Sequence, residues 1–312
     1  MRTQQIPAIV CAGIAVQDLI FRVDAFPIPG GKTQAHDVIT VSGGCAANAA
    51  IAAARLGGRV RFAGPLGGRG DGISQRILAD LARENINVKD VVRVARATAP
   101  LSSIMIDERG ERTIATYRDP LLNTARPANP DRLLNGVALV LADNRFPEFV
   151  QPICAAARSR GLPVILDADK PAREDDPLFA SASHVIFSGE CLRATTRLSD
   201  LHGALRQMKS RLAAFLAVTD GANDVLWTQS GPPKRMPVIA VKAVDTLAAG
   251  DVFHGAFALA LAERMSEPAA LRFAAATASL KCSRFGGISG APTRAELDGF
   301  LSTRAVEGSH GG

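Results

Sequence analysis

Apolar β-rich runs alternate with Ala- and Leu-rich helical stretches along most of the chain, and this alternation constrains the fold most strongly. The pattern predicts strands at residues 8–14, 60–63, 137–142, 163–167, 184–188, 215–219 and 224–228, and helices at 46–56, 73–84, 148–160, 251–265 and 268–282. Strands that alternate with helices of this length predict an α/β fold with a doubly wound, mostly parallel sheet flanked by helices. Ligands of such sheets bind beyond the carboxyl ends of the strands.

Two stretches, at about residues 15–41 and 100–119, break this alternation because they carry β-type residues with no helix between them. Within the second stretch, residues 103–107 and 112–118 flank turn-forming residues, which predicts a hairpin. We therefore expect a single domain over residues 1–302, with a small β-sheet lid built from these two stretches. The small and polar residues at 303–312 predict a flexible tail.

Composition narrows the class of protein. The 312 residues carry a formal net charge of +6 with no basic run, and only 5% are aromatic, which argues against nucleic-acid binding. No apolar run reaches the ~18 residues of a membrane span, and no signal-peptide pattern is present. The 5 cysteines are scattered without a C-x-x-C pair, as in reduced proteins. We expect a cytoplasmic protein that binds neither nucleic acid nor membrane.

The segment at residues 245–251, Asp-Thr-Leu-Ala-Ala-Gly-Asp, is the most informative motif because it leads directly into a predicted helix. Backbone N–H groups at a helix N-terminus are unpaired and attract anions, and small side chains let an anion approach them. A carboxylate at Asp251 could accept a hydroxyl proton beside such an anion, which suits phosphoryl transfer. An ordinary helix cap formed by Asp251 explains the spacing equally well.

A second segment, Ser-Gly-Gly-Cys-Ala-Ala-Asn at residues 42–48, opens the first Ala-rich helix. Gly43 and Gly44 permit a close approach between the backbone and a ligand, and the amide of Asn48 could bind hydroxyl groups. The same small residues would also suit a tightly packed joint between a strand and a helix.

These segments resemble the signatures of the PfkB carbohydrate kinases, the ribokinase-like family. Residues 245–251 resemble D-T-x-G-A-G-D, with Ala248 in place of the commonest Gly, and residues 43–48 resemble G-G-x-x-x-N. Residues 13–18 look like the first strand of the family, and residues 64–72 match its next turn. The order of these motifs implies a ribokinase-like fold and an ATP-dependent sugar kinase, a phosphotransferase with an alcohol acceptor.

The resemblance also assigns roles to single residues. It makes Asp251 the base that removes the proton from a sugar hydroxyl. The backbone of Ala248, Ala249 and Gly250 becomes an anion hole for the transferred phosphoryl group. Contacts to the sugar are expected from residues in the first sixth of the chain: Asp18, Gly43, Gly44 and Asn48.

Two further segments resemble the nucleotide side of the family. Residues 218–221 resemble the start of a T-x-G-x-x-G turn whose last Gly is replaced by Asp224, and residues 278–287 resemble the segment that borders adenine. ATP contacts are therefore expected from Thr219, Gly221, Thr246, Lys281, Cys282 and Gly287. The resemblance also implies a monovalent cation such as K⁺, held by Asp245 and by the loop that contains Ser283 and Ser289.

Mg²⁺ should accompany ATP in a kinase of this family. The family's N-x-x-E motif, which is linked to magnesium through water, is absent at residues 188–191, where the sequence is Ser-Gly-Glu-Cys. Glu190 is a displaced substitute at best, so the sequence assigns no magnesium contact.

The identity of the sugar depends on three positions. Lys32 and Arg145 match positions at which sulfofructose kinases bind a sulfonate, whereas Thr116 stands where those enzymes usually have Asn. This pattern favours transfer of the γ-phosphoryl group to a primary hydroxyl of a ketohexose-type sugar, including an anionic one such as sulfofructose. Either cation could equally be an ordinary surface residue.

Several alternatives stay open at this stage. Ribokinase, fructokinase and nucleoside kinase activities occur in the same family. The altered turn at Asp224 also permits an inactive sugar-binding regulator. An exposed lid sheet, finally, is expected to pair with a second copy as a homodimer.

Overall fold

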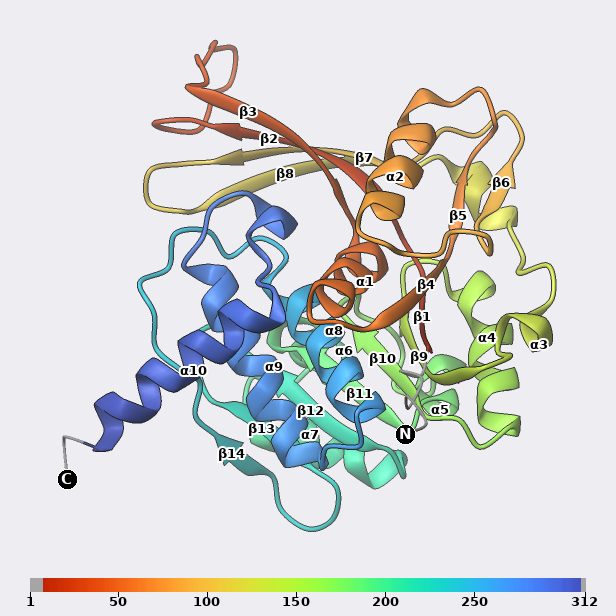
Figure 1. Cartoon of the computed structure of the whole chain (residues 1–312), viewed down its shortest axis with the longest axis vertical. Helices are drawn as coiled ribbons and strands as arrows, with labels where there is room; N and C mark the ends of the chain where they lie inside the picture. Colours follow the sequence, from red (N-terminus) through yellow and green to blue (C-terminus); the bar gives the residue numbers. More distant parts are fainter. Residues whose placement is uncertain (1–7, 310–312) are drawn as a thin grey trace, which may run out of the picture.

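The computed structural model describes residues 8–309, with side chains up to residue 303. An eight-stranded sheet forms its centre, in the order β14-β13-β12-β11-β10-β9-β1-β4 (Figure 1). The six strands β4, β1, β9, β10, β11 and β12 pair in parallel, and β13 and β14 add two antiparallel neighbours at one edge. The mostly parallel α/β sheet predicted from the sequence is therefore confirmed. Its strands are β1 (Ala8–Ala12), β4 (Arg59–Ala63), β9 (Val137–Asp143), β10 (Val164–Ala168), β11 (His184–Ser188), β12 (Phe215–Thr219), β13 (Val225–Thr228) and β14 (Lys234–Met236).

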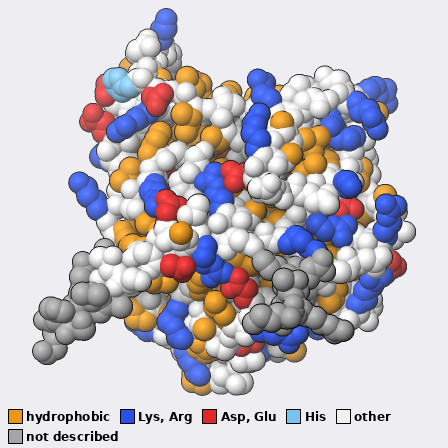
Figure 2. All heavy atoms as spheres, in the orientation of Figure 1, with side chains coloured by type: hydrophobic (Ala, Val, Ile, Leu, Met, Phe, Trp, Pro, Cys, Tyr) orange, Lys and Arg blue, Asp and Glu red, His pale blue; other side chains and the backbone are white. Residues whose placement is uncertain are grey.

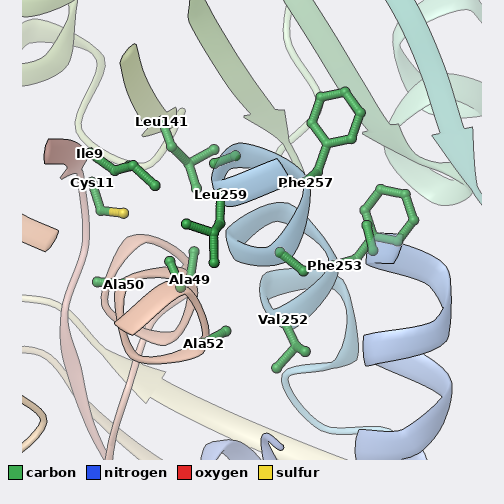
Figure 3. Close-up of a cluster of buried hydrophobic side chains, with 14 of the residues drawn as sticks. Ile9, Cys11, Ala49, Ala50, Ala52, Leu141, Val252, Phe253, Phe257 and Leu259 are labelled. Atoms are coloured by element: carbon green, nitrogen blue, oxygen red, sulfur yellow. The ribbon is translucent and has the colours of Figure 1, made fainter. Parts of the chain in front are cut away.

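Helices cover both faces of this sheet, so its central strands are apolar on both sides. On one face, Ile9, Cys11 and Leu141 pack against α1 (Cys45–Arg55), α8 (Ala249–Ala262) and α9 (Glu267–Cys282). Figure 3 shows these side chains beside Ala49 and Leu259. Alternate residues of the same strands face the second layer, because successive side chains of a strand point to opposite faces. That layer contains α4 (Pro147–Ser159), α5 (Pro177–Ser181), α6 (Gly189–Thr196) and α7 (Leu201–Arg211).

The close approach of α1 to α8 places two motifs of the sequence together. A Cβ atom added to Gly255 would lie 2.2 Å from the carbonyl oxygen of Ala49, so only glycine fits at this crossing. The small alanine side chains of α1 also allow the two helices to approach closely. As a result, Asn48 of α1 meets the first turn of α8.

A second sheet lies over one end of the central sheet (Figure 1). Its order is β3-β2-β7-β8, with β2 (Val16–Arg22), β3 (Asp37–Gly43), β7 (Leu101–Ile106) and β8 (Arg112–Tyr117). Its inner face is anchored by Ile20, Ile104 and Ile106, against which Leu247 and Phe285 of the main domain pack. These strands come from the two stretches in which the sequence predicted a lid, and the predicted hairpin is β7–β8.

Short elements complete the chain. They are β5 (Pro65–Gly67), β6 (Val92–Val94), α2 (Gly72–Arg83), α3 (Pro130–Leu133), the 3₁₀ turns η1 (Pro120–Thr124) and η2 (Gly287–Gly290), and α10 (Arg294–Ser309). Residues 303–309 of the expected flexible tail continue α10, so the chain is helical there. Residues 310–312 of that tail, and residues 1–7 of the expected domain, lie outside the described residues.

The surface carries dispersed charge. On the face shown in Figure 2, Lys and Arg side chains are interspersed with acidic ones and do not gather in one stripe. No helix between residues 8 and 309 combines the length and the apolar character that a membrane span requires.

Candidate active site

A cavity of about 970 Å³ lies between the lid sheet and the carboxyl ends of the central strands. A volume of this size can hold a nucleotide and a small second substrate. Most residues that the sequence assigned to the site line it, from several elements: Asp18, Gly44, Asn48, Thr116, Arg145, Thr219, Gly221, Thr246, Ala248, Ala249, Gly250, Asp251 and Cys282.

The first turn of α8 forms the floor of the cavity. Ala248 is the N-cap residue, with φ 63° and ψ 9°, and no side chain caps the helix. The first N–H groups of the helix therefore lack a capping side chain and border the cavity beside Ala249 and Gly250. This geometry suits an anion such as a phosphoryl group.

Asp251 is not the cap of α8, so the simpler explanation of its position is wrong. It is the third residue of the helix, and its Oδ2 accepts a hydrogen bond of 2.7 Å from Nδ2 of Asn48. Burial, followed by the charge of Asp167, raises the pKa of Asp251 to about 7, although the Asn48 hydrogen bond opposes this rise. A carboxylate with such a pKa is suited to accept a proton near neutral pH.

Asp167 and His254 lie behind Asp251, and the sequence reading missed both. Oδ1 of Asp167 is 3.5 Å from Nε2 of His254, and both side chains are buried. Nδ1 of His254 also lies 2.7 Å from the carbonyl oxygen of Gly250, which ties the pair to the anion-binding turn. Burial raises the pKa of Asp167, while His254 lowers it. The position of Asp167 at the carboxyl end of a predicted strand was the available signal.

Cys45, Asp167 and Asp251 could geometrically enclose an ion, since their ligand atoms lie within 4.8 Å of one another. The chemistry does not suit Mg²⁺, which prefers oxygen ligands. Burial raises the pKa of Cys45 well above its usual value, so the thiol stays protonated. Asp167, moreover, already faces His254.

Carboxylate and glycine backbone meet in the part of the cavity where the sequence analysis expects the sugar. Asp18 is buried, and burial raises its pKa to about 6, while a hydrogen bond from Ser102 opposes the shift. A Cβ atom at Gly43 would lie 1.9 Å from Oδ2 of Asp18. Gly43 is therefore not a lining residue; it makes room for Asp18. Gly44, with φ 93°, does line the cavity.

Asp143, which was also not predicted as a site residue, accepts backbone hydrogen bonds that stabilise this part of the cavity. Its Oδ2 accepts hydrogen bonds from the N–H groups of Ile14 at 2.7 Å and of Ala46 at 3.1 Å. Asp143 thereby joins the end of β1 to the start of α1 and fixes the direction in which Asn48 points.

The three positions that the sequence linked to a sulfonate separate in space. Arg145 lines the cavity and pairs with Asp169, and Thr116 Oγ1 lies 3.1 Å from Ser102 Oγ. Lys32, in contrast, is exposed in the connection between β2 and β3 and is not among the described residues that line the cavity. The expected pairing of Lys32 with Arg145 within one chain is wrong because that connection extends away from the cavity.

Lid strand β8 and the residue that follows it contribute two arginines, Arg112 and Arg118, that were not predicted from the sequence. Arg112, Ile114, Thr116 and Arg118 all line the cavity, as expected for alternate residues of one strand face. Nη1 of Arg112 donates to Oγ1 of Thr246 at 2.7 Å, so the lid contacts the anion-binding turn directly. Strand periodicity from Thr116 was the signal that could have found them.

The part of the cavity where the sequence analysis expects the nucleotide has an apolar wall. Thr219 and Gly221 lie at its edge, and Gly221 has φ 62°, a conformation that glycine adopts readily. The wall itself suits a flat base and comes from β13, from the connection between β14 and α8, and from α9: Val225, Val238, Ile239, Ala243, Ala275 and Ala278.

Five residues expected at the nucleotide or cation site do not line the cavity: Asp245, Lys281, Ser283, Gly287 and Ser289. Lys281 is fully buried, and its Nζ donates to the carbonyl oxygen of Asp245 at 2.7 Å. The N–H of Gly287 donates to Oδ2 of Asp245 at 2.7 Å. Ser283 Oγ donates to the carbonyl of Leu280, and the carbonyl of Ser289 accepts from Arg55. Their expected contacts with ATP or K⁺ are replaced by contacts within the protein.

Comparisons with known proteins agree with this geometry. The model of the pfkB family carbohydrate kinases matches residues 7–294. The chain is 30% identical over 293 residues to the ribokinase of Bacillus subtilis (strain 168), covering 93% of this chain and 98% of that protein.

Solved structures show the same likeness. A putative ribokinase from Agrobacterium tumefaciens superposes with a TM-score of 0.91 at 36% identity, covering 96% of this chain and 98% of the other. The ribokinase of Arabidopsis thaliana complexed with ribose and ATP gives a TM-score of 0.82 at 26% identity, covering 95% and 99%. The chain belongs to the PfkB family of carbohydrate kinases. Within it, the chain is a ribokinase-like phosphotransferase that uses an alcohol group as acceptor.

Proposed function

We propose that the protein transfers the γ-phosphoryl group of ATP to the primary hydroxyl of a furanose sugar, either ribose or a ketohexose. The observation that carries this proposal is Asn48. Its amide holds Asp251, while its Oδ1 is buried without a hydrogen-bond partner among the described residues. A sugar hydroxyl would satisfy that oxygen, since a buried acceptor without a partner is costly. The Arabidopsis relative bound to ribose and ATP supports the same pair of substrates.

Each group of residues in the site has a separate role in the proposed reaction. Asp251 takes the proton of the attacking hydroxyl, and Asp18 orients the sugar from the opposite wall. The backbone of Ala248, Ala249 and Gly250 and the dipole of α8 stabilise the charge on the transferred group. The lid excludes water, which would otherwise accept the phosphoryl group.

Mg²⁺, when bound with ATP, would neutralise phosphate charge in this reaction. We assign its protein contact to Glu190, since magnesium is usually held by one or two carboxylates together with phosphates and water. Glu190 lines the cavity, whereas Asp169 pairs with Arg145 and Asp220 pairs with Arg193 at 3.0 Å.

An anionic ketohexose such as sulfofructose is the second candidate acceptor. Arg118, Arg145 and Lys170 line the cavity. Nη1 of Arg118 donates to the backbone carbonyl of Arg145 at 2.7 Å, so the guanidinium of Arg118 lies next to Arg145. A guanidinium fork suits a tetrahedral anion such as a sulfonate.

A screen of acceptors tests these candidates. ATP consumption is measured with ribose, fructose, fructose 6-phosphate, sulfofructose and adenosine. The screen is repeated on Arg145→Ala and on the control Arg173→Ala, which also removes an arginine paired with an aspartate but at an exposed site. A neutral sugar preferred by all three proteins supports the first candidate. A sulfonate preference lost only in Arg145→Ala supports the second, and no consumption with any sugar would favour an inactive sugar-binding regulator.

We also propose that the lid sheet mediates a homodimer in the cytoplasm. β8 is exposed along its length, and Tyr117 and Val38, which do not line the cavity, expose 56% and 54% of their surface. Exposed apolar groups on edge strands favour pairing with another strand. The free cysteines fit a reducing compartment. Sedimentation of Tyr117→Lys, at a residue of β8 that does not line the cavity, tests the dimer, because a monomeric variant is expected and an unchanged dimer would contradict this interface.

A further inference from the structure

The Asp245 turn, which precedes the anion hole, is held by a buried lysine. Lys281 lies in the last turn of α9 and is 0% exposed. Its Nζ donates to the carbonyl oxygen of Asp245 at 2.7 Å and lies 3.4 Å from Oδ2 of the same residue. The buried ammonium of Lys281 therefore contacts two oxygens of Asp245.

The carboxylate of Asp245 has further partners that link two loops. Its Oδ1 accepts the N–H of Leu247 at 2.8 Å, and its Oδ2 accepts those of Gly286 at 3.1 Å and Gly287 at 2.7 Å. Leu247 directly precedes Ala248, the N-cap of α8. Asp245 thus orients the turn that presents the backbone of the anion hole.

Three carbonyl oxygens of the loop from which K⁺ ligands were expected, those of Gly286, Ile288 and Ser289, already accept hydrogen bonds. Nη1 of Arg55 donates to the carbonyls of Ile288, Ser289 and Ala291 at 3.3, 2.9 and 3.0 Å. The carbonyl of Gly286 accepts the N–H of Ser289 at 3.0 Å. A monovalent metal ion at Asp245 would also lie beside the ammonium of Lys281, and like charges at such a distance repel. The residues present therefore do not fit the expected K⁺.

We propose that the Lys281 ammonium is a built-in cation that replaces the monovalent metal ion and holds the Asp245 turn ready for phosphate binding. Lys281 is a positioning residue, because it does not line the cavity and acts through Asp245. Nucleotide affinity and turnover should then not require K⁺. The inference rests on the proposed ATP-dependent function.

The test measures the affinity for MgATP by calorimetry, which needs no sugar, and then the turnover with the best acceptor. Both are compared in KCl and in tetramethylammonium chloride at equal ionic strength. For the wild-type protein we expect values within about twofold of each other. Activation by K⁺ of tenfold or more would overturn the proposal. No binding of MgATP in either salt would remove the proposed function itself and this inference with it.

Variants separate a positioning role from a purely structural one. Lys281→Ala should lose tenfold or more in MgATP affinity in tetramethylammonium and regain most of it in KCl or methylammonium chloride. The control Lys242→Ala, at an exposed lysine just before the same turn, should behave as wild type in every salt. A folded Lys281→Ala protein that is unchanged, or equally weakened in all salts, would contradict the proposal. If this variant does not fold, the salt response of the wild type decides alone.

Discussion

The side-chain amide of Asn48 donates to the carboxylate of Asp251 at 2.7 Å, across the close contact between α1 and α8. The bond joins the two signature segments, which are 203 residues apart in the sequence. It also leaves the other end of the amide, Oδ1, buried and free to accept a hydrogen bond. Asn48 can therefore orient the base and the sugar at the same time.

Asn48→Ala should shift the pH dependence of the reaction. The hydrogen bond from the Asn48 amide lowers the pKa of Asp251. Removal of that amide should therefore raise the apparent pKa of kcat from near 7 by about one unit. Turnover at pH 7 should fall, recover partly at pH 8–9, and be accompanied by a higher KM for the sugar. Rate profiles of both proteins from pH 5 to 9 measure this shift. Identical profiles would show that Asn48 does not influence the base.

Asp251→Asn should stabilise the protein without ligands, and more so at higher pH. The folded-state pKa of Asp251, about 7, exceeds the unfolded value of about 3.9. Its contribution to stability is therefore fully present below pH 4 and is lost as the pH rises through 7. Asparagine does not titrate, so the variant should gain about 1 kcal/mol or more over wild type between pH 4.5 and 8. Urea unfolding of both proteins at pH 4.5 and pH 8 measures the gain. A stability difference between the two proteins that does not change with pH would contradict a raised pKa of Asp251.

Arg112→Ala should slow phosphoryl transfer. The guanidinium contacts Thr246 beside the anion hole, where it can stabilise charge on the transferred group. We expect kcat to fall by about 10–100-fold with a smaller change in sugar KM. Arg109→Ala, in the same hairpin but with a side chain that is 81% exposed, serves as the control and should keep full activity. Equal rates in both variants would remove Arg112 from the site.

Ala248→Gly should stabilise the fold by about 1 kcal/mol, because alanine holds a left-handed conformation there with φ 63°. Turnover should change little, since the backbone keeps its course. Thermal unfolding measures the stability. A lower melting temperature than wild type would mean that the alanine methyl group contributes packing that outweighs its backbone strain.

The central sheet and its helices could be predicted because each buried strand is a short apolar run between helical stretches. The cavity residues that lie in recognisable motifs, such as Asp18, Asn48 and Asp251, could be predicted equally well. Side chains that depend on contacts across the chain were not. Asp167 acts on Asp251 only because α8 lies over the end of β10, and no local pattern shows this.

Lys281 illustrates the same limit more sharply. Its position beside Cys282 made it a candidate to line the nucleotide site, yet its ammonium points into the protein and meets Asp245, 36 residues earlier. Lys32 differs in another way, since its turn sequence is typical of a loop but does not specify the direction in which the loop extends. Both outcomes depend on tertiary placement of a flexible side chain or loop.

The central claim is that Asp251 removes the proton from the sugar hydroxyl. Its most direct test is the single-turnover rate of Asp251→Asn with saturating MgATP and sugar, together with MgATP affinity by calorimetry. The account predicts a loss in rate of about a thousandfold or more, with MgATP affinity within about threefold of wild type. A near-normal rate with intact binding would contradict the assignment of Asp251 as the base.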